Sequence, residues 1–180
     1  QLANPEYSFL LEGNIIEGNT IYSDHGAGAG IQAYKGIVRN NIFENNSILN
    51  SWGWGGGLII DGNRFTGFND SIYIRLEGNT YSGNIAPSGG SGLFIDEGAN
   101  VRLLNELIIK NRTTESFRDG AFYIDGPRGT SEARTEFENC TIADNTGADY
   151  SYGHAIFIEG ESEVTGKNSI FSGNSSADNN

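Results

Sequence analysis

GNIIEGN (13–19) opens a series of six seven-residue phrases that decide how this chain folds. The others are NNIFENN (40–46), GNTYSGN (78–84), NELIIKN (105–111), NCTIADN (139–145) and NSIFSGN (168–174). The seventh position is asparagine in every copy: Asn19, Asn46, Asn84, Asn111, Asn145 and Asn174. Glycine would also occur there if only a positive φ were needed, so we infer that the amide itself is required. Because an amide both donates and accepts, it can bond to its copy in the next repeat, which predicts a stacked asparagine ladder.

Two other positions of the phrase are restricted. The first is glycine or asparagine in every copy. These residues adopt a positive φ at the lowest cost, so the position predicts a left-handed turn. The fourth is always large and apolar, which predicts a core position: Ile16, Phe43, Tyr81, Ile108, Ile142 and Phe171.

A second phrase is an apolar segment bounded by small residues and ending in an acid. Its copies are GLIIDG (57–62), GLFIDEG (92–98), AFYIDG (121–126) and AIFIEG (155–160), with a weaker copy GIQAYKG (30–36). Apolar residues alternate along these segments, which predicts strands. A looser third strand is predicted at 71–76, 100–104 and 135–137, and around Val164.

Three short strands per repeat and no amphipathic helical stretch predict an all-β fold. The ladder asparagines are 27, 38, 27, 34 and 29 residues apart, so insertions fall in turns while the strands stay in register. Strands that wind in one sense make a parallel β-helix solenoid of about six coils, about 4.8 Å apart. We expect a single domain over residues 1–180. The segment 104–111 also fits a leucine-rich-repeat phrase, but no other repeat does, and this alternative is not favoured.

Both ends of the predicted stack lack a cap. The segment LEGN occurs at 11–14 and again at 76–79, but only the later copy follows a strand-like stretch. The first coil is therefore expected to be incomplete. Because repeat arrays usually need polar caps, we expect a segment of a longer stack, continued end to end by more chain or by another copy.

Composition restricts the partners. The 180 residues include 11 Lys and Arg against 23 Asp and Glu, a formal net charge of −12, which argues against nucleic acid and anionic membranes. No apolar run is long enough for a membrane span. The only cysteine, Cys140, excludes an intrachain disulfide framework, and we expect a buried thiol. This composition suits an extracellular protein or one that binds divalent cations.

The acids that close the second phrase are candidate metal ligands. They are Asp61, Asp96, Asp125 and Glu159, with Lys35 interrupting the column. Stacked carboxylates repel unless a cation lies between them, and calcium prefers oxygen ligands. The alternative, which we favour, is a set of Asp-Gly turns whose carboxylates accept local backbone bonds. No other cofactor is expected.

Aromatic residues gather in the insertions at 20–29, 47–55, 85–89, 112–119 and 146–152. If the coils stack, these insertions emerge on one side of the molecule. They contain Tyr22, Trp52, Trp54, Phe117, Tyr150 and Tyr152. Exposed rings could stack on sugars or contact a protein. Alternatively, they fold back as small clusters beneath the loops.

The chain resembles right-handed parallel β-helix proteins of the pectin-lyase-like class. More narrowly it resembles the repeats of polymorphic outer membrane proteins, whose signatures are GG-A-[ILV] and F-x-x-N. The segments FENN (43–46) and FSGN (171–174) match the second signature, while GGL (56–58) and GSGL (90–93) approximate the first. The resemblance implies a right-handed coil and a secreted or surface-displayed location.

Function is less constrained than fold. A lyase of this fold would need clustered basic residues beside acidic metal ligands, yet only Arg75 and Arg102 come close to sharing a column. His25 and His154 lie in turns without an evident partner. We therefore expect a non-enzymatic extracellular β-helix: a stalk, adhesin passenger or fibre subunit. The alternative is a calcium-dependent polysaccharide-binding or polysaccharide-degrading protein, with host or environmental glycans as partners.

Overall fold

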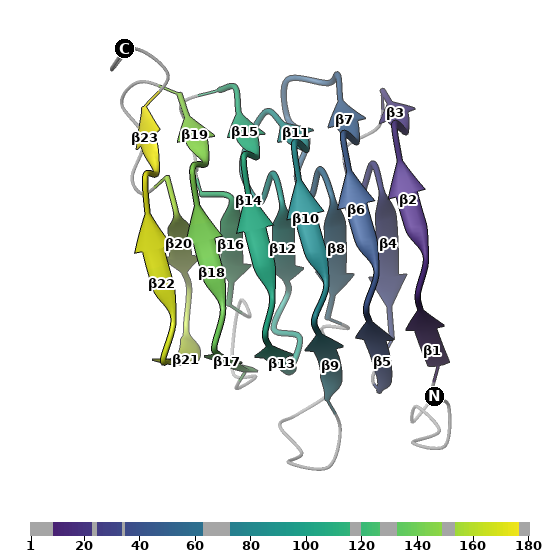
Figure 1. The fold of residues 1–180 in the computed structure, drawn as a ribbon, viewed down its shortest axis with the longest axis vertical. Coiled ribbons are helices and arrows are strands. Elements are labelled where there is room, and N and C mark those ends of the chain that lie inside the picture. Colours follow the sequence, from purple (N-terminus) through teal and green to yellow (C-terminus); the bar gives the residue numbers. More distant parts are fainter. Residues whose placement is uncertain are drawn as a thin grey trace.

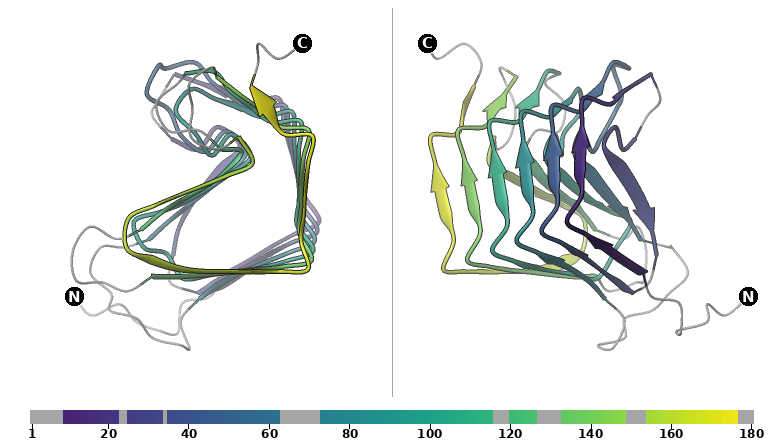
Figure 2. Two further views of the ribbon diagram at one scale, coloured as in Figure 1. Left: turned by 90° about the vertical axis from the view of Figure 1, so that its left-hand side faces the viewer. Right: turned by 45° about the vertical axis from the view of Figure 1, so that its right-hand side comes forward.

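The computed structural model describes residues 9–22, 25–33, 35–62, 73–115, 120–126, 133–148 and 154–176. Every regular element within these ranges is a β-strand, as the sequence predicts. The chain winds in successive coils, and equivalent strands of neighbouring coils pair in parallel (Figure 1). Viewed along the stack, the coils superpose on one outline (Figure 2).

The strands form four parallel sheets, which we number in the order that the chain visits them. The first contains β1 (Phe9–Glu12), β5 (Gly36–Arg39), β9 (Ile74–Glu77), β13 (Val101–Leu104), β17 (Ala133–Glu138) and β21 (Ser162–Lys167). The second contains β2 (Ile15–Glu17), β6 (Ile42–Glu44), β10 (Thr80–Ser82), β14 (Leu107–Ile109), β18 (Thr141–Ala143) and β22 (Ile170–Ser172). The third contains β3 (Thr20–Ile21), β7 (Ser47–Ile48), β11 (Ile85–Ala86), β15 (Arg112–Thr113), β19 (Thr146–Gly147) and β23 (Ser175–Ser176). The fourth contains β4 (Ala29–Gln32), β8 (Leu58–Asp61), β12 (Leu93–Asp96), β16 (Phe122–Asp125) and β20 (Ile156–Glu159).

Two details differ from the sequence analysis. Each described coil has a fourth strand of two residues, directly after the ladder asparagine, where only a turn was predicted. The strand expected to be missing from the first coil is present as β1, which pairs with β5 from Phe9 to Glu12. A two-residue strand is too short to show alternation. The strand β1 was missed because it includes Leu11 and Glu12 of the shared LEGN segment, whereas the strand was expected to precede that segment.

Left-handed residues turn the chain at both ends of each second-sheet strand. The first position of the phrase has a positive φ in all six copies, between 48° at Asn168 and 67° at Gly13, which confirms the prediction. The sixth position is also left-handed in all six copies, which the sequence analysis missed. Glycine, asparagine or aspartate, the residues that most readily adopt this conformation, occupy the position in five copies. The exception is Lys110, which has φ 55°.

The asparagine ladder is confirmed, and its bonds explain why no other residue replaces asparagine. The Asn84 amide donates to Asn111 Oδ1 at 3.0 Å and to the Phe43 carbonyl at 2.8 Å. Its own Oδ1 accepts from the backbone N–H and from the side-chain amide of Asn46, both at 3.0 Å. The same pattern links the other members from Asn19 to Asn174. The four ladder asparagines between these two ends are fully buried.

A second ladder occupies the second position of the phrase. Its members are Asn14, Asn41, Asn79, Glu106, Cys140 and Ser169. The buried Asn79 amide donates to both carboxyl oxygens of Glu106, at 3.2 and 3.0 Å, inside the stack. Burial raises the pKa of Glu106 to about 8 and that of Cys140 to about 11. The sequence analysis expected a buried thiol at Cys140, which is 2% exposed, but did not recognise the ladder because its residue types vary.

The core fills the inside of the coils. At the fourth position of the phrase, Phe43, Tyr81, Ile108 and Ile142 are fully buried, as predicted. The rings of Phe43 and Tyr81 stack with centroids 5.1 Å apart. Phe171, in the last described coil, is 45% exposed because no described coil follows it.

A column of small residues packs against the asparagine ladder. The register of the fourth sheet aligns Gly28, Gly57, Gly92, Ala121 and Ala155 immediately before their strands. A Cβ at Gly57 would lie 2.4 Å from the Gly92 carbonyl oxygen and 3.0 Å from Asn84 Nδ2. The ladder asparagine of the first phrase therefore packs against the small residue that opens the second phrase.

Candidate functional site

Two rows of side chains cover the outer face of the first sheet. Strand alternation points Val101 and Leu103 into the core and Arg102 and Leu104 outward. The register then places Arg75, Arg102, Glu136 and Thr165 in one row. It places Glu77, Leu104, Glu138 and Lys167 in the other. Arg75 and Arg102 are thus neighbours, as the sequence analysis inferred.

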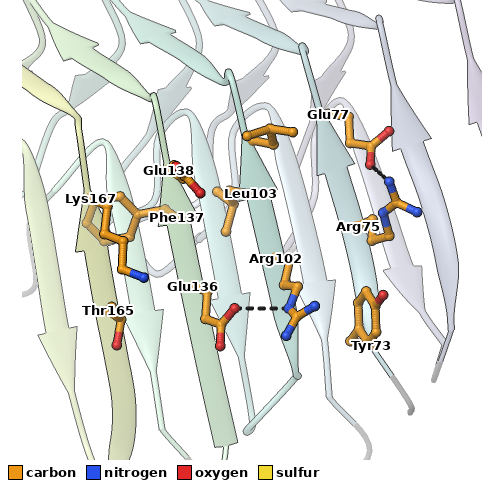
Figure 3. A pocket seen from close by; sticks show the side chains of 11 residues that line it. Tyr73, Arg75, Glu77, Arg102, Leu103, Glu136, Phe137, Glu138, Thr165 and Lys167 are labelled. Atoms are coloured by element: carbon orange, nitrogen blue, oxygen red, sulfur yellow. Dashed lines mark hydrogen bonds and ion pairs between the residues drawn. The ribbon is translucent and has the colours of Figure 1, made fainter. Parts of the chain in front are cut away.

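These rows line a groove of about 530 Å³ over β9, β13, β17 and β21 (Figure 3). Tyr73, just before β9, forms part of its wall. Three strand-to-strand steps make the groove roughly 14 Å long, given about 4.8 Å between neighbouring strands. Its length therefore suits a short extended ligand that lies across the strands, parallel to the axis of the stack.

Both arginines of the groove form ion pairs. Arg102 Nε lies 3.0 Å from Glu136 Oε2, and the guanidinium lies 4.8 Å from the centre of the Tyr73 ring. Arg75 pairs with Glu77, two residues further along the same strand. Figure 3 shows both ion pairs, with the ring of Tyr73 below Arg75 and beside Arg102. A guanidinium held by a carboxylate and a ring keeps its donors in a fixed plane.

The acids and the lysine of this groove were not predicted from the sequence. The signal was present, because charged residues alternate with buried ones in β17, at Glu136 and Glu138 around Phe137. It was missed because the third strand was recognised only over 135–137. The register that joins Lys167 to Glu138 also could not be known before the coils were aligned.

The acids of the second phrase do form a row on the fourth sheet. Asp61 pairs in register with Asp96, and Asp125 with Glu159. The residue that precedes Asp61 in the row is Gln32, which donates to it at 2.9 Å. The prediction that Lys35 interrupts the column is wrong, because β4 ends at Gln32.

Protein donors already bond to several of these carboxylates. The Glu97 backbone N–H donates to Asp96 at 2.7 Å, and the Tyr123 hydroxyl donates to Glu159 at 2.7 Å. Burial, reinforced by the charge of Asp125, raises the pKa of Asp96 to about 7. Within the described ranges, no three His, Cys, Asp or Glu side chains come together as a metal site.

The aromatic insertion residues have different environments. Tyr22 and Trp52 are 80% and 59% exposed, beside the third sheet. Trp54 instead packs on a cluster of Ile59, Phe94 and Tyr123, and its ring lies 5.2 Å from that of His25, edge to face. Phe117, Tyr150 and Tyr152 lie outside the described residues.

That cluster covers the outer face of the fourth sheet, which the sequence analysis did not predict. The rings of Phe94 and Tyr123 stack with centroids 4.7 Å apart, and the ring of Phe157 lies 5.2 Å from that of Tyr123, tilted by 41°. The signal was the continuous apolar run in each second phrase, since a strand buried on both faces lacks alternation.

Comparisons with known proteins identify the architecture alone. A family model described as a right handed beta helix region matches residues 8–129 and 54–179. No curated protein and no solved structure matches the chain. No helix that could cross a membrane was found in the part of the chain that the structure describes.

Proposed function

The chain belongs to the family of right-handed β-helix proteins, and from that premise we propose that it is a non-enzymatic, adhesive extracellular scaffold. Its adhesive surface is the groove over β9, β13, β17 and β21, and its ligand is a carbohydrate chain. The fold itself does not decide this role, since β-helices carry many functions.

The observation that carries the proposal is the Tyr73–Arg102–Glu136 arrangement. It offers an aromatic ring, a planar set of N–H donors and a carboxylate within one groove. Sugars present hydroxyl groups that donate and accept, beside apolar C–H faces that stack on rings. Because the three side chains project from the first sheet, or from directly beside β9, binding needs little rearrangement.

Two features of the chain support an extracellular or cell-surface location. The repeats resemble those of polymorphic outer membrane proteins, and the formal net charge is −12. Exposed Tyr22 and Trp52 lie beside the third sheet and offer a second aromatic surface for the same kind of ligand.

The test is a glycan array probed with the purified protein, with and without a calcium chelator. We expect binding that survives the chelator and is lost in Arg102→Ala. The matched control is Arg39→Ala, because Arg39 forms an equivalent ion pair with Glu12 at 2.8 Å on the same sheet but outside the groove. If Arg102→Ala binds like the wild type, the groove is not the adhesive surface. Binding that requires calcium, or cleavage of the polymer, would favour the calcium-dependent alternative.

A second role, end-to-end association with another copy of the chain, is favoured by an exposed core position on β22. Phe171 on β22 occupies a core position of the phrase but is 45% exposed, whereas Ile142 one coil earlier is fully buried. The outer edge of β22 also presents backbone groups that another parallel strand could pair with. We expect concentration-dependent association in sedimentation velocity that Phe171→Ser abolishes. Unchanged association in that variant would contradict this role.

A further inference from the structure

Given the proposed function, on which this inference rests, we infer that the groove selects an uncharged glycan over a polyuronate or another anionic polymer. The groove contains three cationic side chains, Arg75, Arg102 and Lys167. The described lining residues also include three carboxylates, Glu77, Glu136 and Glu138. The formal charges of these lining groups therefore balance.

Two of the three cations form ion pairs with carboxylates of the groove itself, Arg102 with Glu136 and Arg75 with Glu77. The third, Lys167, lies beside Glu138 in register. An anionic ligand could pair with Arg102 only by displacing Glu136 or by lying close to it. Either arrangement brings two negative groups together, which offsets the attraction to the guanidinium.

The rest of the molecule opposes an anionic polymer as well. The formal net charge of −12 produces a negative field that lowers the local concentration of polyanions. A long polyanion extends far beyond the groove, so it meets this field at many points. Salt screens such repulsion over about 8–10 Å at ordinary ionic strength, so the opposition is greatest in dilute buffer.

A neutral sugar meets no such opposition. The ion pair brings together only Arg102 Nε and Glu136 Oε2, so the other N–H groups of Arg102 and the second oxygen of Glu136 can bond to adjacent sugar hydroxyls without breaking the pair. The side chains of Arg102 and Glu136 are 55% and 38% exposed, and therefore accessible to a ligand. Tyr73 and Leu104, which is 37% exposed, supply apolar surface for a sugar face.

Because Glu136 keeps Arg102 from pairing with an anionic ligand, it is a specificity-determining residue. The substitution Glu136→Gln keeps the shape and an acceptor oxygen but removes one negative charge, which leaves Arg102 available to an anion. Because an exposed ion pair contributes at most about 1 kcal/mol to stability, the variant should fold. Glu12→Gln is the matched control, since it removes the same charge from the Arg39 pair, outside the groove.

The experiment measures binding of length-matched neutral oligosaccharides and oligogalacturonates by isothermal titration calorimetry, in low and high salt. We expect the wild type to bind a neutral oligosaccharide at least about tenfold more tightly than the uronate, with an affinity that barely changes with salt. Glu136→Gln should gain several-fold in uronate affinity, most in low salt, while Glu12→Gln should not. Tighter binding of the uronate by the wild type would overturn the inference but leave carbohydrate binding intact. Binding of neither class would overturn the proposed function itself.

Discussion

Removing one amide from the middle of the ladder should strongly destabilise the fold. In Asn84→Ala, the Asn46 backbone N–H and one hydrogen of the Asn46 amide lose their acceptor. The Phe43 carbonyl loses a donor at 2.8 Å. Each buried group left without its partner costs about 1–3 kcal/mol, so the three together cost about 3–9 kcal/mol. That is a large part of the about 5–15 kcal/mol that stabilises a typical domain.

The assay is equilibrium urea denaturation followed by far-UV circular dichroism, with Asn19→Ala as the control. Asn19 is exposed, and Asn46 Oδ1 keeps its bond from the Asn19 backbone N–H when the side chain is removed. The control should therefore lose less than about 1 kcal/mol. Asn84→Asp gives a second check, because its carboxylate would face the Phe43 carbonyl and Asn111 Oδ1 and should recover stability as acid protonates it. Equal losses in Asn84→Ala and Asn19→Ala would refute the idea that the ladder amides hold the coils together.

Three further predictions concern buried residues of the stack. Folding raises the pKa of Glu106 from 4.5 to about 8, so the folded state binds more protons than the unfolded state between these pH values. The free energy of unfolding should therefore fall as pH rises from 4.5 to about 8. Thermal melts at several pH values in this range should show that Glu106→Gln removes the part of this fall that Glu106 causes. Gly57→Ala should lower the free energy of unfolding by more than about 2 kcal/mol in urea titrations, because the new Cβ would lie 2.4 Å from the Gly92 carbonyl oxygen. The control Ala121→Gly, in the same column, should lower it by less. A smaller loss in Gly57→Ala than in Ala121→Gly would contradict the packing argument. The thiol of Cys140 is 2% exposed and its pKa is raised to about 11. It should therefore react with a thiol reagent only when urea unfolds the protein. Rapid labelling of Cys140 in the folded protein would contradict this prediction.

The elements that repeat with a fixed residue type could be predicted from the sequence. The ladder amides, the left-handed first position and the buried fourth position each carry one physical requirement in every coil. The second ladder could not be found this way, because Asn79, Glu106 and Cys140 meet a similar requirement with different side chains. The left-handed sixth position was hidden for the same reason, since Lys110 adopts it at a cost that the surrounding corner imposes.

The groove could not be predicted from the sequence, for a different reason. Its members are far apart in the chain, and their alignment depends on the register between coils of unequal length. Arg102 and Glu136 become neighbours only when Val101 is aligned with Thr135. The acidic row of the fourth sheet was misaligned for the same reason. Lys35 was predicted beside Asp61, whereas the structure has Gln32 at that position.

The fixed register between coils gives the molecule a simple route to evolutionary change. Gain or loss of a whole coil would leave the ladder and the small-residue column continuous, and would alter the length of the outer face by one strand spacing, about 4.8 Å. Duplication of a unit such as β9 through β12 would therefore extend the array of outward side chains without a new core having to evolve. A lineage built on this principle can match the reach of its binding surface to longer ligands in uniform increments.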